Sequence, residues 1–371
     1  MRNFGLVLAG VLVALTFQST FVAGQKPDAA PVVGAAPKTS IPRLPDGHPD
    51  LQGTYDVATL TPLERQAGAP AVLSAVQAKA LEKGVAQRNA QAAAPSREDR
   101  KAPPVGGDGS PGPAGNVGGY NNFWLDSGTE LITINGEKRT SIIVDPPDGR
   151  VPAITPEAKQ RIARRAIQTT SDAQARENDP GFEGNGAYDD PERRPLGERC
   201  LLGFGSTSGP PALPVLYNNL HQIVQTHDYL MILNEMDHDA RMIRIGGQHP
   251  PATIRKWMGD SIGHWEGDTL VVDTTNFSDK TRFRGSTENL HVVERFSRLD
   301  AETLLYRFTI DDAATWTRPW TGEYPWPMTT DNLYEYACHE ANYALGDILR
   351  GARLKEAEEA GKKTEQAGKK Q

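Results

Sequence analysis

A histidine and a glutamate three residues apart are the first side chains in this sequence whose types and spacing could do chemistry. Imidazole titrates near neutral pH, and a carboxyl group among apolar neighbours holds its proton to a higher pH than usual, so both can transfer protons. His291 and Glu294 lie in one predicted strand, where this odd spacing directs them to opposite faces. Glu294 shares its face with Val292 and Phe296, which predicts that its carboxyl group points into the protein interior. The alternative is a solvated glutamate that pairs with a neighbouring arginine.

A second titratable group for Glu294 must come from another segment, and His221 is the candidate. It follows Tyr217 and Asn219 at the start of a predicted strand, so that an imidazole, a phenol and an amide could surround one ligand. The alternative is a loop in which asparagine side chains bond to their own backbone. We therefore take His221, Glu294 and His291 as catalytic candidates, and Tyr217 and Asn219 as ligand-binding candidates.

Four aromatic residues near the end of the predicted sheet share one parity. Trp316, Trp320, Tyr324 and Trp326 all have even numbers, and in an extended chain such residues line one face. Aromatic faces stack on sugar rings, phenolic compounds and other flat ligands. Ordinary core packing is the alternative, because tryptophan and tyrosine bury large areas. Trp320 and Tyr324 are the two that we expect to line a ligand site.

The sequence lacks the motifs of several common metal and nucleotide sites. The 8 histidines are scattered without an HExxH or HxH pattern, and we interpret Asp237-His238-Asp239 as an exposed turn between strands. Neither GxxxxGK(S/T) nor a GxGxxG motif that follows a strand is present, which argues against nucleotide binding. We therefore expect no metal and no cofactor.

The chain contains two cysteines, Cys200 and Cys338. In an oxidising compartment their pairing is the default interpretation, so we predict a disulfide. Two buried free thiols are the alternative.

Residues 1–24 have the composition of a secretory signal peptide. Arg2 precedes an apolar run from Phe4 to Phe17, and Ala23 and Gly24 are small residues suited to cleavage. The run is shorter than the roughly 20 residues that span a bilayer, and a retained N-terminal anchor is the alternative. No later segment approaches that length. We therefore expect an exported protein, periplasmic or extracellular, with no transmembrane segment after cleavage.

Charge and composition narrow the class of partner. The 40 basic and 47 acidic residues give a net charge of −7 without a long block of one sign, which excludes a dedicated nucleic-acid binder. The 36 glycines and 28 prolines favour strands and turns over helices. The partner that we expect is a small-molecule ligand.

These side chains must be positioned by a β-rich domain at residues 121–353. Before it we expect a flexible linker at 25–50 and an N-terminal extension at 51–120, with one helix and a Gly/Pro-rich disordered insert. A charged tail follows at 354–371. Short connections between the strands demand antiparallel pairing. The expected strands are Gln52–Asp56, Asn122–Asp126, Glu130–Ile134, Arg139–Val144, Leu220–Gln225, Tyr229–Asn234, Ala240–Ile245, Thr269–Thr274, His291–Arg298, Thr303–Ile310 and Trp316–Tyr324.

Local signals mark one turn and three helices. Asn135-Gly136 predicts a type I′ hairpin, whose two central residues need a positive φ. Thr155 and Pro156 predict the capped start of a helix that runs to about Ile167. The other helices are expected at 71–94 and at about 341–353.

Five blocks of the sequence resemble a widespread family of secreted proteins from environmental bacteria. These blocks are RTSIIVDPPDGR (Arg139–Arg150), YNNLHQIVQT (Tyr217–Thr226), GHWEGDTLVVDTTNF (Gly263–Phe277), ENLHVVERF (Glu288–Phe296) and YEYACHEANY (Tyr334–Tyr343). The resemblance covers about Arg139 to Arg353. It implies export and a shared scaffold, but it carries over no catalytic residue, because no activity is established for the family.

The sequence thus predicts a mainly β protein, an antiparallel meander that forms a barrel-like, lipocalin-like sheet with a few peripheral helices. We expect a ligand cavity in the barrel or at its mouth. The leading hypothesis is a cofactor-free hydrolase or lyase that acts on a small carbohydrate or aromatic compound by His/Glu acid–base chemistry. The alternatives are a lipocalin-like binding protein without chemistry and an envelope protein that uses its aromatic face as a contact surface.

Overall fold

The computed structural model describes residues 40–92, 125–168, 188–204, 208–340 and 342–368. All of these belong to the unit Lys38–Gln371. The expected signal peptide, most of the linker, the Gly/Pro-rich insert and most of the expected strand Asn122–Asp126 lie outside the described residues.

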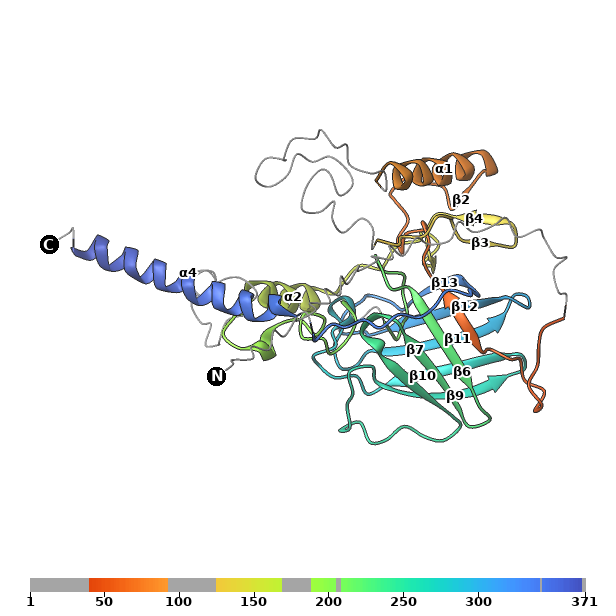
Figure 1. Ribbon diagram of the computed structural model, residues 1–371. Coiled ribbons are helices and arrows are strands. Elements are labelled where there is room, and N and C mark those ends of the chain that lie inside the picture. Colours follow the sequence, from red (N-terminus) through yellow and green to blue (C-terminus); the bar gives the residue numbers. More distant parts are fainter. Residues whose placement is uncertain (1–39, 93–124, 169–187, 205–207, 341, 369–371) are drawn as a thin grey trace, which may run out of the picture. The chain divides into compact units, whose positions relative to one another are not determined.

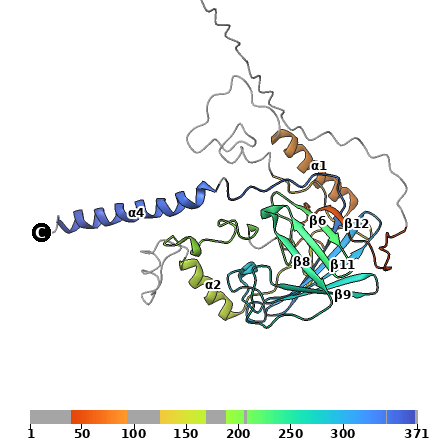
Figure 2. The same cartoon turned by 60° about the horizontal axis from the view of Figure 1, so that its bottom comes forward.

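Ten strands form one curled sheet, a half-barrel, in the spatial order β1-β6-β7-β8-β9-β10-β11-β12-β13-β5 (Figure 1, and turned in Figure 2). The bounds are β1 Gly53–Asp56, β5 Ile143–Asp145, β6 Leu220–Gln225, β7 Tyr229–Asn234, β8 Ala240–Ile245, β9 Asp260–Glu266, β10 Thr269–Thr275, β11 His291–Arg298, β12 Thr303–Asp311 and β13 Trp320–Pro327. The expected mainly β, barrel-like fold is confirmed.

The curl of the sheet brings its first strand back to the end of β13. Tyr55 of β1 forms an antiparallel bridge with Met328, which directly follows β13. The amide of Thr329 donates to the carbonyl of Thr54 at 2.9 Å. This contact partly closes the half-barrel and shields the interior on that side.

The pair β8–β9 is parallel, whereas all other neighbouring pairs of this sheet are antiparallel. A parallel pair needs a long crossover, and residues 246–259 supply it. Strand β9 was not among the expected strands, because Gly263 and the polar His264 and Glu266 interrupt an apolar alternation. The last strand was expected at Trp316–Tyr324, whereas β13 spans Trp320–Pro327.

Side chains of β11 and β12 alternate between a buried and a half-exposed face, and the buried face fills the half-barrel. Phe296, Tyr306, Phe308 and similar residues there have no exposed surface. Gly322 lies opposite Phe308 on β13, and a Cβ at Gly322 would come within 2.2 Å of that ring. The glycine therefore makes room for the aromatic core.

A second, three-stranded sheet has the order β2-β4-β3 and the bounds Val72–Leu73, Glu137–Arg139 and Thr133–Ile134. Asn135 and Gly136 join β3 to β4 with φ of 52° and 79°, which confirms the predicted turn. Helix α1, Ala75–Ala92, is held beside this sheet by the Lys138–Glu82 ion pair at 2.8 Å.

Two further helices and a disulfide complete the described chain. Helix α2, Pro156–Gln168, begins as predicted, with the amide of Ala158 donating to Oγ1 of Thr155 at 3.1 Å. Helix α4, Tyr343–Gly368, is longer than expected and continues into the charged tail. The predicted Cys200–Cys338 disulfide is confirmed, with Cα atoms 5.7 Å apart. Over the described ranges, none of the helices has both the length and the apolar character to cross a membrane.

Candidate functional site

Glu294 lies inside the half-barrel beside Val292 and Phe296, as predicted, and it is 0% exposed. Both of its carboxylate oxygens are bonded. Arg241 of β8 donates from Nη1 to Oε1 at 2.9 Å and from Nη2 to Oε2, and the hydroxyl of Tyr306 donates to Oε1 at 2.8 Å. A buried carboxylate held this way is fully engaged by the protein, so we do not retain Glu294 as a catalytic group.

Two hydroxyl groups complete this buried cluster. Arg241 donates from Nε to Ser261 at 3.0 Å and from Nη2 to Thr274 at 3.1 Å, and the two hydroxyl oxygens are 3.0 Å apart. The run Gly259–Gly263 has the GxSxG spacing of a nucleophile elbow, which needs a serine exposed on a strand-to-helix turn. Ser261 instead lies within β9 and is 3% exposed, so it does not serve as a nucleophile.

His221 faces the same interior but does not bond to Glu294. Its Nδ1 donates to Oδ1 of Asn234 at 2.5 Å, and its ring stacks on Trp326 with centroids 4.9 Å apart. Burial lowers the pKa of His221 to about 4, against the opposing effect of Asn234. The imidazole is therefore neutral near pH 7. The rings of Trp326 and Tyr306 lie between His221 and Glu294 and contact one another. The predicted direct pairing of His221 with Glu294 is therefore not observed.

Trp320 and Tyr324 belong to the packed core. Both are 0% exposed. Trp320 packs edge-on against Phe308, and Tyr324 packs edge-on against Tyr306 and donates from its hydroxyl to the carbonyl of Ala212 at 3.0 Å. Their rings therefore offer no free face to a ligand, and the core-packing alternative describes them.

His291 lies on the outer face of β11 and pairs with Asp273 of β10. Its Nε2 is 2.7 Å from Oδ2 of Asp273, and the two side chains are 40% and 34% exposed. The hydrogen bond to Asp273 is the main cause that raises the pKa of His291, and the nearby Asp311 adds to it. The same bond lowers the pKa of Asp273. Among the described residues no hydrogen bond engages Nδ1 of His291, and the side chain is 40% exposed.

His249, from the crossover between β8 and β9, extends this pair into a chain. Its Nε2 is 2.9 Å from Oδ1 of Asp273, and its Nδ1 is 2.9 Å from Oδ2 of Asp260. An ionised carboxylate only accepts hydrogen bonds, so each ring nitrogen of His249 faces an acceptor and the ring bridges the two carboxylates. The outer face of the sheet thus carries the alternating row His291, Asp273, His249 and Asp260, which we call the outer-face relay.

Asp260 anchors the buried end of the outer-face relay. Its side chain is 1% exposed and accepts from Arg244 at 2.7 and 3.0 Å and from Lys256 at 2.9 Å. Burial raises the pKa of Asp260, but the hydrogen bonds from Arg244, Lys256 and His249 outweigh it and hold the pKa well below its usual value. Asp260 therefore stays ionised, and it fixes His249 in its place.

Of the two predicted ligand residues before β6, Asn219 stabilises its own loop and Tyr217 packs against another tyrosine. Asn219 is 2% exposed and holds its own loop, because its amide accepts from Val215 at 2.8 Å and donates to Asp126 at 2.8 Å. This is the backbone-capping alternative. Tyr217 is half-buried and stacks on Tyr336 with centroids 6.5 Å apart.

The turn between β7 and β8 is only partly exposed, because His238 is exposed as expected, whereas Asp239 is half-buried and Asp237 is buried. Asp237 is 7% exposed in a left-handed conformation with φ 55°, and neither of its carboxylate oxygens has a hydrogen-bond partner. Burial raises the pKa of Asp237, and it raises the pKa of Asp239 to about 7. The loop of Gly203 lies against this turn, with the amide of Gly203 donating to Oδ2 of Asp239 at 3.3 Å.

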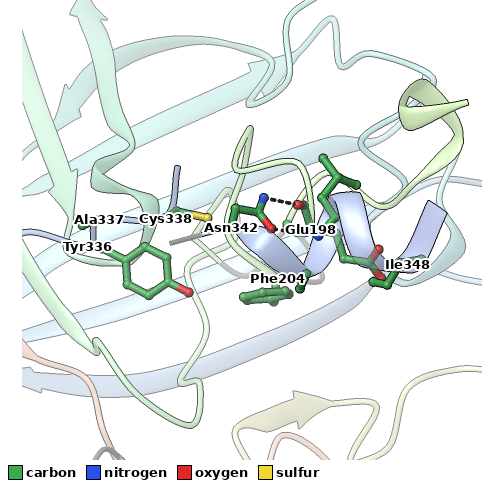
Figure 3. A pocket seen from close by; sticks show the side chains of 10 residues that line it. Glu198, Phe204, Tyr336, Ala337, Cys338, Asn342 and Ile348 are labelled. Atoms are coloured by element: carbon green, nitrogen blue, oxygen red, sulfur yellow. Dashed lines mark hydrogen bonds between the residues drawn. The ribbon is translucent and has the colours of Figure 1, made fainter. Parts of the chain in front are cut away.

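A groove of about 330 Å³ lies beside the disulfide, between residues 197–204, residues 336–338 and the start of α4. In the view of Figure 3, Tyr336 and Ile348 lie at its two sides with Phe204 between them. Asn342 donates to the carbonyl of Glu198 at 2.7 Å and so ties the start of α4 to the loop (Figure 3). The groove is therefore framed by a covalent bond and a hydrogen bond.

Sequence reasoning missed Arg241, Asp273 and His249. Arg241 could have been found from the sequence, because it shares its parity with Ile243 and Ile245 of β8 and so lies on the buried face. A buried arginine needs an acidic partner. Asp273 and His249 had none. Their contacts depend on the pairing of β9, β10 and β11 and on the path of the crossover.

Comparisons with protein-family models, curated proteins and solved structures found no match to this chain. Within the part of the chain that the structure describes, no three His, Cys, Asp or Glu side chains are arranged to hold a metal ion.

Proposed function

We propose that the protein is an exported enzyme whose acid–base group is His291, oriented by Asp273. The observation that carries this proposal is the 2.7 Å contact between Nε2 of His291 and Asp273, which leaves Nδ1 of this partly exposed ring without a hydrogen bond among the described residues. A carboxylate on one imidazole nitrogen fixes the orientation of the ring and favours its protonated form, while the other nitrogen exchanges a proton with a substrate. His249 holds the second oxygen of Asp273 and so fixes the carboxylate itself.

The reaction class that fits this geometry is hydrolysis or elimination. Protonated His291 donates from Nδ1 to a leaving group, and neutral His291 accepts a proton there from water or from a carbon acid. Both cysteines form the disulfide, so the chain has no thiol nucleophile. In hydrolysis, water therefore attacks the small carbohydrate or aromatic substrate. In elimination, removal of a proton from the substrate expels the leaving group.

Export of this enzyme is supported by the disulfide, which persists outside the reducing cytosol. The apolar start of the sequence and the resemblance to a family of secreted bacterial proteins agree with it.

The test is turnover of a defined panel of glycosides, sugar esters and aryl esters, followed by mass spectrometry. The purified protein is compared with H291Q, D273N and H264Q. His264 is the matched control, because it is an exposed histidine of β9 whose ring, among the described residues, bonds only to Glu266. We expect H291Q to lose at least about 100-fold in turnover, in line with general acid–base contributions, and H264Q to match the parent protein. Equal turnover by H291Q and the parent, or no turnover by the parent, would contradict the proposal.

A further inference from the structure

The groove beside the disulfide has an apolar lining and no basic side chain among the lining residues that the structure describes. Phe204, Tyr336, Leu345 and Ile348 are among its lining residues, and its volume suits a small ligand. Its one charged lining residue, Glu198, is already paired with Arg194 at 2.8 Å. The lining alone therefore favours a ligand with an apolar aromatic or aliphatic part.

Asp237 supplies the second observation, independent of the lining. It is more than nine-tenths buried, and both of its carboxylate oxygens lack a hydrogen-bond partner. A buried carboxylate without a partner is costly, and native proteins rarely leave one unless a ligand or a proton satisfies it. The turn that carries Asp237 lies beside the segment that carries Tyr336, because the amide of Tyr334 donates to Oε1 of Glu235 at 3.1 Å. The charge of Asp237 also raises the pKa of Tyr336, after the larger effects of burial and Tyr217.

Asp239 adds a second carboxyl group behind the same wall. The amide of Gly203 donates to it, which places it against the loop that carries Phe204. The other titratable groups that act on these two carboxyl groups are His238 and His339, besides Tyr336. Among the described residues neither Asp237 nor Asp239 forms an ion pair with lysine or arginine. This wall of the groove therefore has an excess of acid.

We propose that the groove binds an organic cation, an ammonium group carried on an aromatic or aliphatic body. The body packs against Phe204, Leu345 and Ile348, and the ammonium group lies over the ring of Tyr336, where a cation–π contact stabilises it. The carboxylate of Asp237 behind the ring supplies the opposite charge. An anion of the same shape is repelled by the same carboxylate.

The experiment is calorimetric titration of the whole protein with three probes of one size class. Benzyltrimethylammonium is the cation, benzyl alcohol is the neutral probe and benzoate is the anion. At pH 8 we expect the cation to bind at least about 10-fold more tightly than the alcohol, and benzoate to bind weakest. We also expect the affinity for the cation to rise between pH 6 and pH 8, because burial raises the pKa of Asp239 to about 7 and the probe itself does not titrate.

Variants locate the site. D237N keeps the shape of the side chain and removes its charge, so we expect the cation to bind no better than the alcohol. D148N changes an exposed acid of another turn and is the matched control. Y336L retains an apolar wall but removes the ring, and it also lowers the preference for the cation.

Three results would each overturn the proposal. They are equal binding of cation and alcohol by the parent protein, no binding of the cation, and full preference for the cation in D237N. If D237N does not fold, Y336L and the pH series decide.

Discussion

Strand β11 carries a titratable side chain on each face, and the two have opposite surroundings. Glu294 points inward, has no exposed surface, and gives both oxygens to Arg241 and Tyr306. His291 points outward, is 40% exposed, and keeps one nitrogen free of protein contacts within the described chain. The same strand therefore builds a closed ion pair that serves folding and an open one that can meet a substrate. Burial, and not residue type, separates the two.

The largest effect is expected on breaking the inner pair. E294L leaves the buried guanidinium of Arg241 without a counter-charge, so we expect a loss of about 3–5 kcal/mol in the free energy of unfolding, measured by urea denaturation. The double variant R241M/E294L removes both charges and recovers most of this loss. A single variant as stable as the parent would mean that the inner pair does not serve folding.

An intermediate effect is expected at Asp260, the buried end of the outer-face relay. D260N weakens the four hydrogen bonds that Asp260 makes with Arg244, Lys256 and His249, and we expect a loss of about 1–3 kcal/mol by urea denaturation. The matched control on the same strand is E266Q. Glu266 pairs with Arg295 on the exposed face, so the loss there is at most about 0.5 kcal/mol. Equal losses in both variants would show that the relay is an ordinary surface network.

The smallest effect is the pH dependence of the outer pair. Because folding raises the pKa of His291, its contribution to stability is complete below about pH 6.5 and is lost as the pH rises through the raised pKa. The lowered pKa of Asp273 acts in the other direction, since its contribution is present above about pH 4 and is lost as the pH falls through the lowered value.

We expect H291Q to remove the loss of stability that accompanies the rise in pH through the raised pKa of His291. This loss is below about 1 kcal/mol, because the pair is partly exposed to solvent. Melting temperatures of the parent, H291Q and H264Q at pH 5.5 and pH 8.5 measure it. The same slope in the parent and in H291Q would show that His291 and Asp273 are not coupled.

Much of the sheet could be predicted from the sequence, because strand alternation is a local property. The bounds of β6, β7, β8 and β11 agree with the expected ranges, and so does the placement of Glu294 inside and His291 outside. The partners of these residues could not be predicted. Arg241 meets Glu294 only because a parallel crossover places β8 beside β9, and no local pattern specifies that pairing.

The predicted ligand site shows the same limit. Trp320 and Tyr324 share a face, as their parity predicts, but parity does not say whether that face is filled by other side chains or open. Asp237 was expected to be exposed and is buried for a related reason, because the burial of a turn residue depends on distant segments such as the loop of Gly203.

The disulfide determines what happens to the protein after a single proteolytic cut. Its two cysteines enclose all of β6 to β13, whereas the two edge strands, β1 and β5, come from the chain before Cys200. The eight central strands therefore form a covalent ring. A protease that cuts once inside this ring releases no fragment, since both new ends stay attached through Cys200–Cys338, and the nicked strands remain at high effective concentration for one another.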